Sequence, residues 1–267
     1  MKSGMKLLPI VGLAGLLLAA IISSALAETP APPEFLKTAT YLTSAKCKMC
    51  HKTQFANWSA TKHAANAAAL PWEANKDKPE VPTPEIAARY TTGYDPATKA
   101  WAEKGTACEA CHGPGSVHMK SSKDRQGTIS GPKALATPAQ QISMCGQCHG
   151  QFSVGDKRFA AGYKPGMDLL AMDGVKLDDV KPGTKMAQMN ELVKSTHYAK
   201  GVTCTSCHLS HPEKATAHSL KAPVNELCMS CHKEQTMAAH APAAKDGDTC
   251  ATCHMPEGQH TFAPPAK

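Results

Sequence analysis

Gly201-Val-Thr-Cys204-Thr-Ser-Cys207-His208 contains the five-residue pattern Cys-x-x-Cys-His, which decides how this chain folds. The pattern occurs six times, and all 12 cysteines of the 267-residue chain belong to it. The six motifs are Cys47-Lys-Met-Cys50-His51, Cys108-Glu-Ala-Cys111-His112, Cys145-Gly-Gln-Cys148-His149, Cys204-Thr-Ser-Cys207-His208, Cys228-Met-Ser-Cys231-His232 and Cys250-Ala-Thr-Cys253-His254. Because no cysteine is left over, the pattern indicates one kind of site built six times.

The spacing has a chemical reason. Two thiols three positions apart reach the two vinyl groups of one haem and form a thioether bond with each, and the histidine that follows then lies beneath the iron. The sequence therefore predicts six haem c groups, with the 12 cysteines as attachment points. His51, His112, His149, His208, His232 and His254 are the predicted proximal ligands.

Two other readings of the cysteine pairs fit less well. A Cys-x-x-Cys pair can hold zinc, but a zinc site requires no histidine directly after every pair. A redox-active disulfide typically occurs as one such pair on a βαβ domain.

The distal ligands should come from histidines outside the motifs. There are seven: His63, His118, His197, His211, His218, His240 and His260. Because the supply exceeds six irons by one, we expect six-coordinate, low-spin haems with two histidines each, and methionine ligation is unnecessary. Their positions relative to the motifs favour His63, His118, His197, His211 and His240.

The sixth distal ligand stays open between His260 and His218. His211 follows His208 by three residues, but the matching place after His254 holds Glu257. A third alternative is one haem without a strong distal ligand, which would leave a position for substrate.

Composition predicts the fold class. Aromatic residues make up only 5%, whereas the chain has 20 Pro and 19 Gly. We expect a mainly α fold with much irregular loop, in which stacked haems replace the apolar core. The candidate helices span residues 54–68, 84–90, 96–104, 136–144 and 185–198.

The first 27 residues are typical of a secretory signal peptide. Lys2 and Lys6 precede an apolar stretch from Leu7 to Ile22, and Ala25-Leu26-Ala27 forms a small-x-small cleavage site. An uncleaved anchor is the alternative, but 16 apolar residues are short for a bilayer. We expect a periplasmic protein, or one at the cell surface or outside the cell, with no membrane span after cleavage.

The motif spacing suggests the domain organisation. A flexible lead-in over residues 28–45 should precede one haem-binding domain over 46–260 and a tail over 261–267. Within that domain, two three-motif halves cover about 46–160 and 197–260. The 29 basic and 22 acidic residues are dispersed, which argues against nucleic-acid binding.

The chain resembles the multihaem c-type cytochromes. More narrowly, it is similar to the group that includes the tetrahaem partner of hydroxylamine oxidoreductase, and in part to periplasmic cytochromes that feed outer-membrane electron conduits. The stretches that carry this resemblance are Gly105–Gly115 with His118, Cys145–His149, Gly162–Gly166, Gly201–His208 with His211, and Cys253–Pro256. The resemblance implies a mostly helical and irregular fold with closely stacked haems, and His211 and His240 as distal ligands.

The leading functional prediction is an electron carrier rather than an enzyme. It would relay electrons between redox partners in an anaerobic, nitrogen or metal respiratory chain. Its partners would be a membrane quinol dehydrogenase, other cytochromes or a terminal reductase. One alternative is a multihaem reductase of nitrite, hydroxylamine or a sulfur oxyanion with one open haem. Another is an oligomeric subunit of an extracellular haem filament.

Overall fold

The computed structural model describes residues 31–68, 70–73, 81–131, 134–214, 218–240 and 244–262. The expected signal peptide, residues 1–27, lies outside these ranges. In the described part of the chain, no helix combines the length and the apolar character that crossing a membrane requires.

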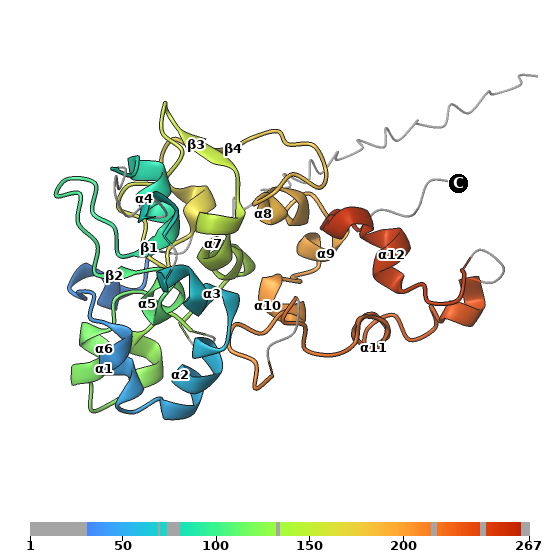
Figure 1. Ribbon diagram of the computed structural model, residues 1–267, viewed down its shortest axis with the longest axis horizontal. Coiled ribbons are helices and arrows are strands. Elements are labelled where there is room, and N and C mark those ends of the chain that lie inside the picture. Colours follow the sequence, from blue (N-terminus) through green and yellow to red (C-terminus); the bar gives the residue numbers. More distant parts are fainter. Residues whose placement is uncertain are drawn as a thin grey trace, which may run out of the picture.

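Short helices joined by irregular loops make up most of the structure, which confirms the predicted fold class (Figure 1). The α-helices are α1 (Ser44–Lys48), α2 (Lys52–Ser59), α3 (Lys62–Ala65), α4 (Pro84–Tyr90), α5 (Cys108–His112), α6 (Ser116–Lys120), α7 (Pro138–His149), α8 (Gln188–Leu192), α9 (Thr196–Ala199), α10 (Cys204–Cys207), α11 (Val224–Met229) and α12 (Cys250–His254). The 3₁₀ turns are Glu34–Lys37, Asn66–Ala68, Pro71–Glu73, Arg125–Thr128, Leu169–Ala171, Met237–His240 and Pro256–Gly258.

Two small antiparallel hairpins are the sheets of the described residues. β1 (Thr91–Thr92) pairs with β2 (Glu103–Lys104), with Thr91 opposite Lys104. β3 (Phe152–Val154) pairs with β4 (Val175–Leu177), with Ser153 opposite Lys176.

The first α-helices differ from the predicted span of 54–68. Thr61 interrupts that span, because its Oγ1 accepts a hydrogen bond from the Ala64 amide and caps a new helix, α3. The prediction of 84–90 is confirmed by α4, where Thr83 caps and Pro84 occupies the first turn.

The predicted helix over 96–104 was wrong. Asp95 instead accepts hydrogen bonds from the Ala97 amide at 2.9 Å and from Thr98 Oγ1 at 2.9 Å. Lys99 has a φ of 56°, and the chain then enters β2. Local side-chain hydrogen bonds of this kind compete with a helical backbone.

The helix predicted over 136–144 extends to His149, so the third motif ends α7. Thr137 and Gln140 form a capping box at its start. The helix predicted over 185–198 is divided into α8 and α9 by Ser195, which caps α9 through the Tyr198 amide.

A small apolar core surrounds α7. Ile142 of α7 packs with Phe152, Leu169, Met189 and Leu192, all of which are buried. Gly146 lies inside the third motif, and a Cβ there would overlap the Met189 side chain. Helix α8 therefore packs directly on the backbone of a motif helix.

The lead-in packs against the protein, unlike the loose segment expected over 28–45. Phe35, Leu36 and Ala39 are buried and contact Val117 and Met167. At the other end, α10, α11 and α12 run out from the rest of the molecule (Figure 1). Among the described residues from 204 to 262, Pro212 is the only buried one.

Candidate haem-binding sites

Each of the six motif histidines faces the ring of a histidine from outside the motifs. The ring centroids of these pairs lie 5.7 to 6.5 Å apart. The pairs are His51 with His118, His112 with His211, His149 with His63, His208 with His260, His232 with His197, and His254 with His240.

This separation fits one metal ion between two imidazoles. A metal–imidazole bond is about 2.0 Å long and the ring centroid lies about 1.15 Å behind the nitrogen, so two opposed ligands place their centroids about 6.3 Å apart. Two opposed nitrogen donors suit a porphyrin iron, because the porphyrin supplies the other four ligands. The residues present therefore fit haem.

The ring orientation supports the same chemistry. Nδ1 of each of five histidines lies 2.7 to 2.9 Å from a backbone carbonyl oxygen. The pairs are His112 with Ser130, His118 with Arg125, His208 with His218, His240 with Thr236 and His260 with Gly258. A proton on Nδ1 that is donated to a carbonyl leaves Nε2 with a lone pair for a metal.

His149 differs, because its Nδ1 has a side-chain partner, Gln188 Oε1, at 3.4 Å. Gln188 begins α8, so the same helix that packs on Gly146 also orients the third proximal histidine.

Burial favours neutral imidazoles at several of these positions. Removal from water lowers the pKa of His63, His112, His149, His197 and His260 below the ordinary value. A neutral ring is the form that binds a metal.

Motif helices that follow one another along the chain pack together. Helix α1 contacts α5, α5 contacts α7, α7 contacts α10, and α11 contacts α12. The motifs are therefore neighbours in chain order from the first to the fourth, and from the fifth to the sixth.

A zinc site lacks a ligand set here. In the part of the chain that the structure describes, no three His, Cys, Asp or Glu side chains converge as a metal site. Burial raises the pKa of Cys111 to about 12 and that of Cys148 to about 11, so these two thiols stay protonated at neutral pH.

The structure thus places His63, His118, His197, His211, His240 and His260 opposite motif rings. His218 contributes its backbone carbonyl to His208, and its side chain is exposed. The pairing does not follow chain order, since His63 faces the third motif and His118 the first.

Glu109, inside the second motif, was not singled out by the sequence. Its buried carboxylate accepts hydrogen bonds from the Leu42 amide at 2.8 and 2.9 Å and from the Gly115 amide at 2.7 Å. Burial raises its pKa against the opposing effect of these amides. Glu109 therefore ties the lead-in and the loop after His112 to the motif.

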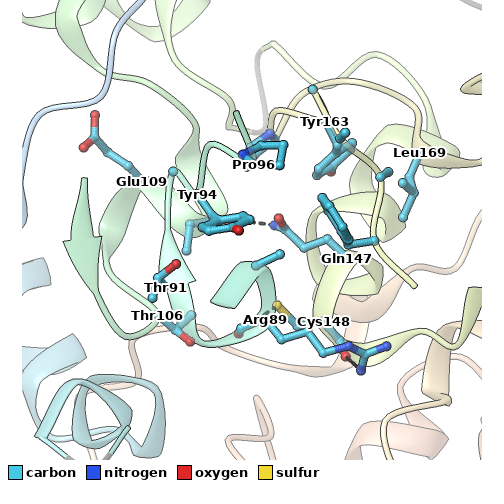
Figure 2. A pocket seen from close by; sticks show the side chains of 18 of the residues that line it. Arg89, Thr91, Tyr94, Pro96, Thr106, Glu109, Gln147, Cys148, Tyr163 and Leu169 are labelled. Carbon is cyan, nitrogen blue, oxygen red and sulfur yellow. Dashed lines mark hydrogen bonds between the residues drawn. The ribbon is translucent and has the colours of Figure 1, made fainter. Parts of the chain in front are cut away.

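A cavity lies beside the helices of the second and third motifs (Figure 2). It has a volume of about 70 Å³ and is lined by Arg89, Tyr94, Gln147 and Tyr163 among others. Arg89 donates to the carbonyls of Cys148 and Gly150 at 3.2 and 3.0 Å. Gln147 donates to the Ala110 carbonyl at 2.7 Å and so connects the two motif helices.

These features define the class: the chain is a multihaem c-type cytochrome. Residues 197–237 match the family described as a doubled CXXCH motif. Residues 46–113 match the family of cytochrome c554 and c-prime.

Two curated relatives match about half of the chain. The multiheme cytochrome MtrA of Shewanella baltica is 30% identical over 161 residues, 52% of this chain and 46% of that protein. The cytochrome c nitrite reductase subunit NrfA of Nitratidesulfovibrio vulgaris is 25% identical over 173 residues, 48% of this chain and 33% of that protein. The chain thus matches less than half the length of either relative.

The fold is also similar to that of a solved structure, the outer cell wall cytochrome OcwA. The TM-score is 0.58 at 20% identity, and the match covers 83% of this chain and 79% of that one. At this identity the likeness concerns the fold.

Proposed function

We propose that this cytochrome carries electrons on six haem c groups, each attached by one motif and held between two histidines. The observation that carries the proposal is that all six motif rings face a second histidine ring at the spacing of two axial ligands. When bound, each haem supplies a one-electron Fe(III)/Fe(II) couple.

The residues of the chain have separate tasks in this proposal. The 12 cysteines fix each group to the backbone, and the motif histidines with His63, His118, His197, His211, His240 and His260 hold the iron from both sides. The carbonyls bonded to Nδ1 orient the rings. The packing of α1 on α5, of α5 on α7, of α7 on α10 and of α11 on α12 supports a relay in which the centres follow one another in chain order.

The pairing favours a carrier over a reductase. Two strong ligands keep an iron six-coordinate and leave no position for substrate. Glu257 stands where a distal histidine could have followed His254, but no motif ring lacks a partner for that reason. His254 faces His240, and His208 faces His260. The similarity to a nitrite reductase subunit makes an enzyme the second candidate.

The setting of the carrier follows from the leader sequence. We propose export through cleavage after Ala27 into the periplasm or to the cell surface. There it would exchange electrons with other redox proteins of a respiratory chain, such as a quinol dehydrogenase, another cytochrome or a terminal reductase.

Low-temperature EPR of the fully oxidised protein tests the proposal. We expect six low-spin ferric centres per chain, matched to six haems by intact-mass spectrometry. A high-spin centre that responds to nitrite or hydroxylamine would replace the carrier with the reductase. Fewer than six haems would remove the six-centre relay.

A further inference from the structure

Two exposed methionines flank the first haem-binding site. Met49 lies inside the first motif with 68% of its surface exposed, and Met119 follows His118 with 48% exposed. The rings of His51 and His118 face each other at 6.0 Å, so both methionines belong to the same end of the molecule. The two ring positions at this site belong to His51 and His118. Met49 lies two residues before His51, and Met119 lies one residue after His118.

Basic side chains surround these methionines. The segments 44–52 and 116–128 carry six exposed bases, Lys46, Lys48, Lys52, Lys120, Lys123 and Arg125, and a single acid, Asp124. Within the described part of the chain, none of the six bases forms an ion pair. We call Met49, Met119 and these six bases the basic end.

Access to the first site is open at the basic end. Cys50 and His51 are exposed, whereas Cys111 and His112 of the second motif are only partly exposed. A partner at the basic end can therefore approach the first site closely.

The charge is opposite at the other end. Residues 204–262 carry six acids and four bases. Leu209 is exposed in this segment, and the charged residues nearest to it in sequence are Glu213 and Lys214. Of these two ends, the basic end therefore combines exposed apolar side chains with an excess of positive charge. Such a combination suits a protein partner with a complementary acidic face, because charge steers the encounter and apolar contact holds it.

We propose that the basic end is the docking surface for an acidic redox protein, which exchanges electrons with the first haem-binding site. This inference rests on the proposed electron-carrying function. It identifies the surface at which one of the two redox partners binds. It commits to a separate protein partner rather than a second copy of this chain.

The test compares two charge-reversed holoproteins. One carries Lys46→Glu, Lys120→Glu and Lys123→Glu, all outside the motifs. The matched control carries Lys157→Glu, Lys176→Glu and Lys200→Glu, which are exposed elsewhere and change the net charge equally. The probe is reduced plant-type ferredoxin, an acidic one-electron donor, and the readout is the bimolecular rate of cytochrome reduction in stopped flow.

At low ionic strength we expect the basic-end variant to lose about tenfold or more of the rate, and the control less than about twofold. Added salt should shrink the difference. In Met119→Ser we expect a rate loss that persists at high salt, because the lost contact is apolar. Equal losses in the two charge variants, or none in the basic-end variant, would overturn the assignment.

Two further measurements separate the alternatives. Equilibrium titration with a small reductant should give the same number of electrons in all variants; a chain that accepts none would refute the carrier function itself. Sedimentation of the wild type should show a monomer. Self-association that the basic-end variant abolishes would identify a second copy as the occupant and overturn the assignment to a separate partner.

Discussion

The ring of His260 faces the ring of His208 with centroids 6.2 Å apart and planes 27° from parallel. The same His208 ring places Nδ1 at 2.8 Å from the carbonyl oxygen of His218. His260 and His218 are the two candidates that the sequence left open for the sixth distal ligand. Both thus interact with one proximal ligand, His208. One contributes its ring and the other its backbone.

This relationship predicts different outcomes for two alanine variants. His260→Ala should convert one low-spin iron per chain into a high-spin one, because His208 loses the opposed ring. His218→Ala should keep six low-spin irons, since the carbonyl remains. Spin-quantified EPR of both oxidised variants makes the comparison. A high-spin centre in His218→Ala alone would show that His218, and not His260, is the distal ligand opposite His208.

Gly146→Ala should destabilise the protein through Met189. The added Cβ overlaps the buried Met189 side chain, and overpacking of this kind costs about 1–3 kcal/mol. Thermal unfolding of the holoprotein measures the loss. Because Met189→Ala opens the space, the double variant should lose less than the sum of the two single changes. Strict additivity would contradict the contact.

Gln188 should tune the third site. Gln188→Glu places a carboxylate near Nδ1 of His149, which makes the ligand more basic and stabilises ferric iron. We expect one haem potential to fall by roughly 60 mV, the equivalent of a tenfold change for a one-electron couple. Gln188→Leu should raise the same potential. A spectroelectrochemical titration reads both, and an unchanged set of six potentials would exclude this role.

Glu109 should give stability a distinctive pH dependence. Burial raises its pKa above the ordinary 4.5, so the folded protein binds this proton more tightly than the unfolded chain. The stability it contributes is therefore fully present below pH 4.5 and falls as pH rises towards the folded pKa.

The matched variant is Glu109→Gln, which has the same shape but no titration. Melting temperatures from pH 4 to 7 should decline with pH more steeply in the wild type than in this variant. Parallel curves would show that the Glu109 pKa is not raised. At pH 4 the variant should be about as stable as the wild type, because the protonated carboxyl group and the amide each offer one carbonyl acceptor to the Leu42 and Gly115 amides.

Local sequence determined the short-range features well. The Cys-x-x-Cys-His spacing specifies the attachment chemistry within five residues, and Thr83-Pro84 specifies where α4 begins. Residues 96–104 show the limit, because Asp95 could cap a helix or close a turn. Its bonds to Ala97 and Thr98 close the turn, and the chain then pairs through β2 with β1.

The sequence by itself determined the number of motifs, the excess of histidines and the mainly helical class, because each depends on residues close together in the chain. Only the tertiary structure decided which histidine faces which motif. His63 reaches the third motif and His211 the second, across distances in sequence that carry no signal for pairing. Such pairings depend on how α3, α7 and the loop after α10 pack around shared sites, and packing is a property of the whole chain.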